Sequence, residues 1–226
     1  MRHVIITILT LTLVSVRLFA QEADATESDW RLEFLVHSGV SSVLDIKDSS
    51  DPNIGTAAPS TAFALSLLYD LGGYFSLSFG LSASGRGGLT WMNGTPFEVW
   101  NNSIHIPVLL HSTSFLHTTQ EIDVFLQYGI GAAIGVPIEQ RVHEIPGIPF
   151  DDKSRFEAGF LDFLTLSIVA DIRFGLRFQR DLTLIVGFRF TQDPKDLHHF
   201  AVSDDALLIP LYRFSGVTLG ISRRVF

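Results

Sequence analysis

The chain has 226 residues, of which 46% are hydrophobic and only 18% are charged. Its 24 acidic and 16 basic residues give a formal net charge of −8 at pH 7, which argues against a nucleic-acid partner because phosphate binding needs a basic surface. The absence of cysteine excludes disulfides, thiolate metal sites and cysteine nucleophiles.

The first twenty residues have the pattern of an export signal. A basic start precedes an apolar run over Val4–Val16, and Leu18-Phe19-Ala20 is typical of a cleavage site. The run is shorter than the roughly 20 apolar residues of a membrane-spanning helix, although an uncleaved anchor is the alternative. We expect residues 1–20 to be removed and residues 21–226 to form one domain.

Eight segments of the remaining chain alternate between apolar and polar residues, with the period of two that is typical of a strand with unlike faces. In Tyr74–Ser84, for example, Phe75, Leu77, Phe79 and Leu81 alternate with serine and glycine. In chain order, we predict strands at about residues 30–43, 61–71, 74–84, 103–113, 121–136, 160–178, 181–191 and 209–226.

The connections between these segments alternate in length. Those after the second and sixth segments are about two residues long, and the turn over 114–120 is moderate. The long connections cover residues 44–60, 85–100, 137–159 and 192–208. This alternation is typical of an up-and-down meander with its long loops at one end. The run Gly85–Gly88 lacks the spacing of a phosphate-binding loop, and we predict a flexible loop there.

The polar faces of the predicted strands distinguish two kinds of β-protein. They consist mainly of Gly, Ser, Ala and Thr, and all three lysines of the chain fall in the predicted connections. A soluble sandwich or a lipocalin-like barrel, which is the alternative, has an apolar interior. Small polar residues suit instead the inside of a narrow barrel whose apolar side chains face lipid, where a sheet must close without edges. We therefore predict an all-β fold, an eight-stranded antiparallel up-and-down transmembrane β-barrel with aromatic girdles near the strand ends.

Charged residues of both signs on the polar faces are predicted to pair inside the barrel, since an unpaired buried charge is costly. These candidates are Arg31, Glu33, Asp70, Asp123, Asp171, Arg173, Arg177 and Arg189. We expect Arg173 and Arg177 each to lie near a carboxylate. The same faces carry His37, His105 and His111, which we predict to be hydrogen-bonded side chains of the lumen, with a metal or proton-transfer site as the alternative. We expect no metal and no cofactor.

Two stretches, IHIPVLLHS over Ile104–Ser112 and DVFLQYGIGAAIG over Asp123–Gly135, resemble the small outer-membrane barrel superfamily that includes PorT-like, OmpX-like and OmpW-like proteins. Residues 170–193 and 217–226 are similar to its sixth, seventh and last strands. The terminal Phe226 resembles the aromatic residue that the barrel-assembly machinery reads, although it is one residue out of phase with the apolar face of its strand. The resemblance implies contact with lipid in the outer membrane of a Gram-negative-type or spirochaete-like envelope.

Three functions follow as alternatives from this interpretation. The first is a non-enzymatic envelope or surface protein with a narrow or plugged polar lumen, whose long acidic loops bind a host or surface ligand. The second is a porin-like conduit for small or hydrophobic solutes, as the OmpW-like resemblance implies, with the apolar stretches Ile145–Phe150 and Ala206–Pro210 near its mouth. A lipid-modifying enzyme is less favoured, because no spacing joins histidine, serine and acid into a catalytic set.

Overall fold

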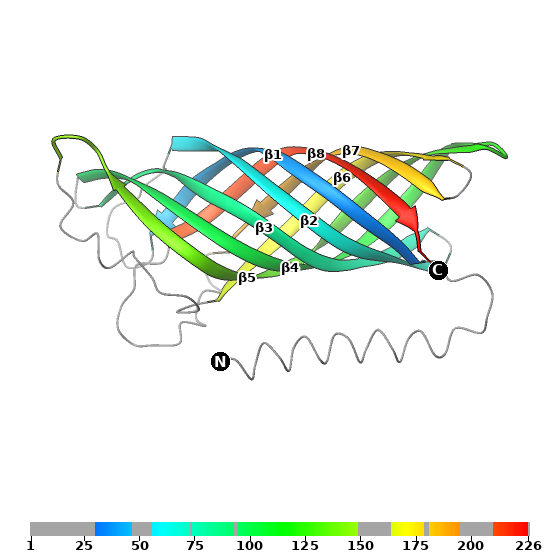
Figure 1. The fold of residues 1–226 in the computed structure, drawn as a ribbon, viewed down its shortest axis with the longest axis horizontal. Helices are drawn as coiled ribbons and strands as arrows, with labels where there is room; N and C mark the ends of the chain where they lie inside the picture. Colours follow the sequence, from blue (N-terminus) through cyan, green and yellow to red (C-terminus); the bar gives the residue numbers. More distant parts are fainter. Residues whose placement is uncertain are drawn as a thin grey trace.

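The computed structural model is a closed barrel of eight antiparallel strands, in which each strand pairs with its neighbours in the sequence and β8 pairs with β1 (Figure 1). In chain order, the strands are β1 (Trp30–Ile46), β2 (Thr56–Gly72), β3 (Phe75–Met92), β4 (Thr95–Thr118), β5 (Ile122–Glu144), β6 (Thr165–Phe178), β7 (Leu182–Gln192) and β8 (Pro210–Arg224). The predicted fold class, eight antiparallel strands in up-and-down order, is confirmed.

The structure describes residues 30–46, 56–72, 74–92, 95–148, 164–178, 181–194 and 210–225. Within these ranges no helix is long and apolar enough to cross a membrane. The predicted export signal, Phe226 and most of the two long connections that follow β5 and β7 lie outside the described residues.

The alternation in the sequence determines which side chains point into the barrel. On β1 the inward residues Glu33, Leu35 and His37 are almost fully buried, whereas Phe34 between them is 46% exposed. Leu35 faces Ala64 on β2 and Gly220 on β8. Small inward partners of this kind make room for the larger side chains that fill a narrow barrel.

Large apolar side chains cover the outside of the barrel. We call this exposed surface the apolar belt. Its members on β1 to β4 are Leu32, Phe34, Val40, Phe63, Leu65, Leu81, Ile104, Val108 and Leu110. Its members on β5 to β8 are Tyr128, Ile130, Ile134, Ile168, Ile172, Phe174, Leu184, Val186, Phe188, Val217, Leu219 and Ile221. The belt runs through all eight described strands, so apolar side chains face outward all around the barrel at this level.

Strands β1 to β5 are longer than predicted at the end where the long connections lie, which we call the loop end. The predicted loop over residues 85–100 is wrong, because β3 continues to Met92 and β4 begins at Thr95. The pairing of β3 with β4 runs without interruption from Arg86 opposite Asn101 to Met92 opposite Thr95. Gly85, Gly87 and Gly88 conceal the alternation in the sequence, and the backbone pairing continues through them.

Near the loop end, the side chains inside the barrel become apolar and those outside it become mostly polar. Here a buried apolar cluster of Val43, Phe97, Val99, Val142 and Tyr212 fills the interior. The outward positions of the same stretches are polar, and they include Glu98, Asn102, Glu139, Arg141 and Arg213. On this outer surface, Glu139 forms an ion pair with Arg141 at 2.6 Å and accepts a hydrogen bond from Asn102 Nδ2 at 3.1 Å. The apolar belt therefore ends before the strands do, and β4 and β5, with 24 and 23 residues, are the longest of the eight described strands (Figure 1).

The closest backbone approach in the barrel involves Gly131 of β5, where a Cβ atom would collide with the backbone carbonyl oxygen of Val108. We expect Gly131→Ala to lower the free energy of unfolding by about 1–3 kcal/mol, because the strand must shift to accept the methyl group. Urea unfolding of the protein folded in detergent micelles measures this loss. Gly85→Ala is the control, since a Cβ there meets only Asn102 Oδ1, at 3.0 Å; equal losses in both variants would contradict the account.

Candidate functional site

The candidate site is the lumen of the barrel, where buried polar side chains form two clusters. The central cluster consists of Glu33 and His37 from β1, His111 from β4, Asp171 and Arg173 from β6, and Arg189 from β7. The loop-side cluster consists of Arg86 from β3, His105 from β4, Asp193 after β7, and Ser167 from β6. The alternation of each strand places all of these residues on its inner face.

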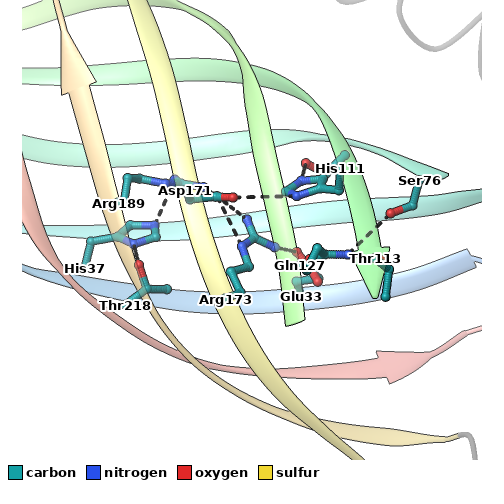
Figure 2. A network of polar contacts seen from close by, with 11 residues as sticks. Glu33, His37, Ser76, His111, Thr113, Gln127, Asp171, Arg173, Arg189 and Thr218 are labelled. Carbon is teal, nitrogen blue, oxygen red and sulfur yellow. Dashed lines mark hydrogen bonds and ion pairs between the residues drawn. The ribbon is translucent and has the colours of Figure 1, made fainter. Parts of the chain in front are cut away.

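Asp171 is the centre of the central cluster (Figure 2). Its Oδ2 atom accepts hydrogen bonds from Arg173 Nη2, at 2.8 Å, and from Arg189 Nη2, at 2.9 Å. Asp171 and Arg189 face each other directly across β6 and β7, and Arg173 follows on the same face of β6. One carboxylate therefore holds two guanidinium groups.

Arg173 also reaches across the lumen. Its Nη1 atom donates to Glu33 Oε2 at 3.0 Å, although β6 and β1 are separated by β7 and β8 in the barrel. Both side chains are 2% exposed. The two acids and two arginines balance in charge, and each arginine is bonded to a carboxylate, as buried charges require. The bridge from Arg173 to Glu33 therefore spans the lumen at this level.

The hydrogen bonds of His37 define its protonation state. A guanidinium group has no acceptor, so the contact of 2.9 Å between Arg189 Nη1 and His37 Nε2 makes Nε2 the acceptor. Nδ1 then carries the proton and donates to Thr218 Oγ1 at 2.8 Å. His37 is a neutral side chain that links the central cluster to β8.

Ser78, His111 and Asp171 lie next to one another in the order serine, histidine, acid, as in a hydrolase triad. The spacing of these residues in the sequence did not predict this arrangement. Ser78 Oγ lies 2.8 Å from His111 Nε2, and His111 Nδ1 lies 3.6 Å from Asp171 Oδ1, a distance too long for a hydrogen bond. Gly129 permits this approach, because a Cβ there would meet both His111 and Asp171. Ser78 and His111 are fully enclosed and Asp171 is held by two arginines, so the arrangement gives no substrate access to the hydroxyl.

In the loop-side cluster, the Asp193 carboxylate accepts three hydrogen bonds. Its Oδ1 atom accepts from Arg86 Nη1, at 3.1 Å, and from Ser167 Oγ, at 2.5 Å. Its Oδ2 atom accepts from the backbone N–H of Tyr212, over whose ring the Arg86 guanidinium lies at 5.8 Å. The second nitrogen of Arg86, Nη2, lies 2.6 Å from His105 Nε2.

The sequence analysis missed Arg86 and Asp193, because both fall in stretches that were predicted to be loops. Arg86 is 4% exposed and Asp193 is 1% exposed. The spacing of two residues does indicate that both side chains point inward. Arg86 continues the inward positions Ser82 and Ser84 of β3, and Asp193 continues the inward positions of β7. The glycines around Arg86 and the proline after Asp193 concealed it.

The remaining sequence candidates lie near the end with short turns. Arg31 is buried and donates to Thr183 Oγ1 at 3.5 Å. Arg177 faces Asp123 across the β5–β6 pair, but within the described part of the chain its guanidinium has no carboxylate at ion-pair distance. It lies instead over the rings of Phe125, at 5.2 Å, and Phe115, at 5.9 Å. Asp70 is half-buried near the end of β2.

Between the two clusters lies a cavity of about 40 Å³. It has room for a few water molecules. Among the residues that the structure describes, no group of three or more acids and histidines is arranged to hold a metal ion. The lumen is thus a packed polar interior with one small chamber described between its charged clusters.

No protein-family model matches the sequence, and no curated protein matches it either. Among solved structures, the chain is similar to Neisserial surface protein A, with a TM-score of 0.42 and 10% identity over 88% of this chain and 98% of that chain. It is also similar to Ail, the attachment invasion locus protein of Yersinia pestis, solved with the heparin analogue sucrose octasulfate (TM-score 0.38, 10% identity, 88% of this chain and 100% of that chain). The translocator domain of autotransporter NalP from Neisseria meningitidis matches with a TM-score of 0.34 and 9% identity, over 97% of each chain.

These scores and identities carry no conclusion about activity. The function of the protein is therefore inferred from the two surfaces of its own barrel, the apolar exterior and the ionic interior.

Replacement of Arg173 tests the central cluster. We expect Arg173→Met to lower the free energy of unfolding by about 3–5 kcal/mol, because it leaves Glu33 as an uncompensated buried charge. Arg177→Met is the matched control and is expected to cost about 0.5–1 kcal/mol, the size of an exposed cation–π contact. Urea unfolding of both variants in the same micelles measures the difference; similar losses would show that the central cluster does not stabilise the barrel.

Proposed function

We propose that this protein is an integral outer-membrane β-barrel that acts as a non-enzymatic surface protein with a closed polar lumen. The observation that carries the proposal is the sidedness of the barrel. Apolar side chains surround its exterior on every strand, and ion pairs fill its centre. Soluble barrels have the opposite arrangement.

The exposure of the belt supports a lipid environment. Ile130, Phe63 and Leu219 are each exposed by more than half, and the belt continues around the closed sheet. Monomeric soluble proteins rarely expose continuous apolar patches larger than a few hundred Å². In lipid the same side chains are at no disadvantage, and closure leaves no backbone edge unpaired.

The borders of the belt support a bilayer of ordinary thickness. On β4 the outward positions from Ile104 to Leu110 are all apolar, and Asn102 and Ser112 flank them. A tilted strand needs about 9–11 residues to span the hydrocarbon. At the short-turn end, Trp30 packs against Tyr69 with ring centroids 4.6 Å apart, and Trp100 lies on β4 toward the loop end. Aromatic side chains at both borders are typical of barrel girdles.

The closed lumen favours a surface role over transport. The Arg173–Glu33 bridge crosses the interior, and Gln127 extends the network by donating to Thr113 Oγ1, at 3.2 Å, and to Ser76 Oγ, at 3.4 Å (Figure 2). A rigid barrel of this kind presents its long connections outside the cell, where variable loops commonly bind ligands. We propose a host or surface ligand for these loops, outer-membrane lipid around the belt, and the barrel-assembly machinery as the partner that inserts the chain.

A conduit for small or hydrophobic solutes is the second candidate. The observation in its favour is the apolar cluster of Val43, Phe97, Val99, Val142 and Tyr212 inside the loop end, together with the chamber below it. A solute would still have to displace the Arg173–Glu33 bridge, whose opening leaves charges uncompensated. This cost makes the closed barrel the better-supported proposal.

A pair of arginine substitutions tests the membrane location. Ile130 and Leu116 are 65% and 60% exposed, but Ile130 lies in the middle of the belt and Leu116 near the short-turn end of β4. We expect Ile130→Arg to cost about 2–4 kcal/mol of unfolding free energy in lipid vesicles and Leu116→Arg about 0–1 kcal/mol. A soluble barrel would tolerate both changes equally, so equal small effects would contradict the proposal.

Conductance separates the closed barrel from the conduit. The protein folded in planar lipid bilayers is expected to give no sustained single-channel current in potassium chloride, because ion pairs cross the lumen. A folded barrel that inserts and carries a steady current would contradict the closed lumen and support the conduit. Insertion is verified in the same preparation by protection of the strands from added protease.

A further inference from the structure

We infer, on the basis of the membrane location proposed above, that the outer face of β8 holds two lipids by their phosphate groups, one in each leaflet, through Arg213 and Arg223. Both arginines are exposed on the outward side of the strand. Between them lie the outward positions Ser215, Val217, Leu219 and Ile221, of which the last three belong to the apolar belt. The outer face of β8 is therefore an apolar run with a cation at each end.

The spacing of the two arginines matches the thickness of a membrane. They are ten positions apart on one strand, which corresponds to about 34 Å of strand length. At the tilt of about 35–45° that is typical of membrane barrels, this length covers about 25 Å along the membrane normal, which is the height of the apolar band of such barrels. Each arginine therefore lies at one border of the hydrocarbon, at the level of the lipid phosphate groups.

Arg223 lies among apolar side chains at the short-turn border. Its neighbours on the adjacent strands are Leu182 of β7 and Leu32 of β1, which are 41% and 38% exposed. Within the part of the chain that the structure describes, no carboxylate lies at ion-pair distance from its guanidinium. A charged side chain that faces hydrocarbon is costly, and arginine avoids this cost by extending its head group to the interface. A lipid phosphate is the anion that Arg223 meets there.

Arg213 is held at the opposite border by two uncharged side chains of β7. Its Nη2 atom donates to Gln192 Oε1 at 3.4 Å, and its Cζ atom lies over the Phe190 ring at 5.9 Å from the centroid. Among the described residues, no carboxylate pairs with it. A guanidinium has five N–H donors, so these contacts fix the position of the group and leave most of its donors available to a ligand.

Arg141 of β5 provides the contrast at the loop end. It is also exposed, but its Nη2 atom lies 2.6 Å from Glu139 Oε1, so the chain itself neutralises its charge. For Arg213 and Arg223, a phosphate diester supplies the negative charge in a shape that fits the planar guanidinium. The acyl chains of the same molecule lie against the apolar belt of β8, and this contact favours a lipid over free phosphate.

Binding of a single phospholipid species tests the inference. Native mass spectrometry of the protein in neutral detergent micelles measures its affinity for dioleoylphosphatidylglycerol, with dioleoylglycerol as the analogue that lacks phosphate. We expect Arg213→Gln and Arg223→Gln each to weaken the binding of one phosphatidylglycerol molecule about tenfold or more, because a charge-assisted hydrogen bond is lost. Arg141→Gln is the matched control and is expected to bind the lipid as the unmodified chain does. Equal affinities of all these proteins, or equal affinities for the two lipids, would overturn the inference.

Solid-state NMR of the unmodified chain gives a readout that does not depend on the folding of a glutamine variant. Arginine is labelled with the heavy isotope of nitrogen, the protein is folded in vesicles of dioleoylphosphatidylglycerol, and dephasing of the guanidinium signals by phosphorus measures direct contact with the headgroup. We expect dephased signals from Arg213 and Arg223. Arg213→Lys and Arg223→Lys each remove one of these signals and keep the bound lipid, since lysine also binds phosphate. Dephasing that is absent, or that is unchanged in both lysine variants, would overturn the inference.

The same vesicles separate lipid binding by β8 from the membrane location on which it rests. Insertion is verified by protection of the strands from added protease. Because the two arginines lie at opposite borders of the belt, contact of both with phosphorus places one lipid in each leaflet. Insertion without phosphorus contact at these arginines would overturn the lipid sites and leave the membrane location intact, whereas failure to insert would contradict both.

Discussion

A sheet of eight strands that closes on itself has an interior just wide enough for side chains from opposite strands to meet. This narrowness controls what the chain can place inside. Small residues such as Ala64 and Gly220 must lie beside larger ones such as Leu35, and a buried charged side chain needs a partner of opposite charge. Arg173 consequently bridges from β6 to Glu33 on β1, and this contact spans the interior and neutralises both charges.

Closure of the sheet also determines which chemical groups the outer surface presents. Closure gives each strand a paired neighbour on both sides along the belt, so the outer surface meets its environment there through side chains. Those side chains are apolar in the belt and polar beyond it, at Glu98, Glu139 and Arg141. Inside the barrel the order is reversed, with ion pairs at the level of the belt and the apolar cluster around Phe97 beyond it. The outer and inner surfaces change polarity at the same level along the barrel axis, where the account places the change from lipid to water.

The sequence predicted the closure, the order of the strands and the inward or outward direction of most side chains, because alternation with a period of two survives in every strand. It did not predict where the strands end. Glycines at 85, 87 and 88 interrupt the apolar pattern of β3, and backbone pairing continues regardless. Arg86 was lost from the predicted lumen for that reason, and Asp193 was lost because a proline follows it.

Individual partners inside the lumen could not be derived from the sequence, since they depend on register. The contact between Ser78 and His111 requires a defined pairing of β3 with β4, and the contact between His111 and Asp171 requires that residue 129 have no side chain. Arg177 illustrates the limit: it faces Asp123 across β5 and β6, yet its side chain lies against Phe125 and Phe115. The predicted export signal and the role of Phe226 stay predictions.

The central claim is that lipid surrounds the belt, and spin-label accessibility tests it most directly. The chain contains no cysteine, so single cysteines at the outward positions 126, 128, 130, 132 and 134 of β5 can each carry one nitroxide in vesicles. The account predicts high access to oxygen and low access to a water-soluble nickel complex, with the contrast greatest near position 130 and reversed at position 143. High nickel access along all of these positions would contradict it.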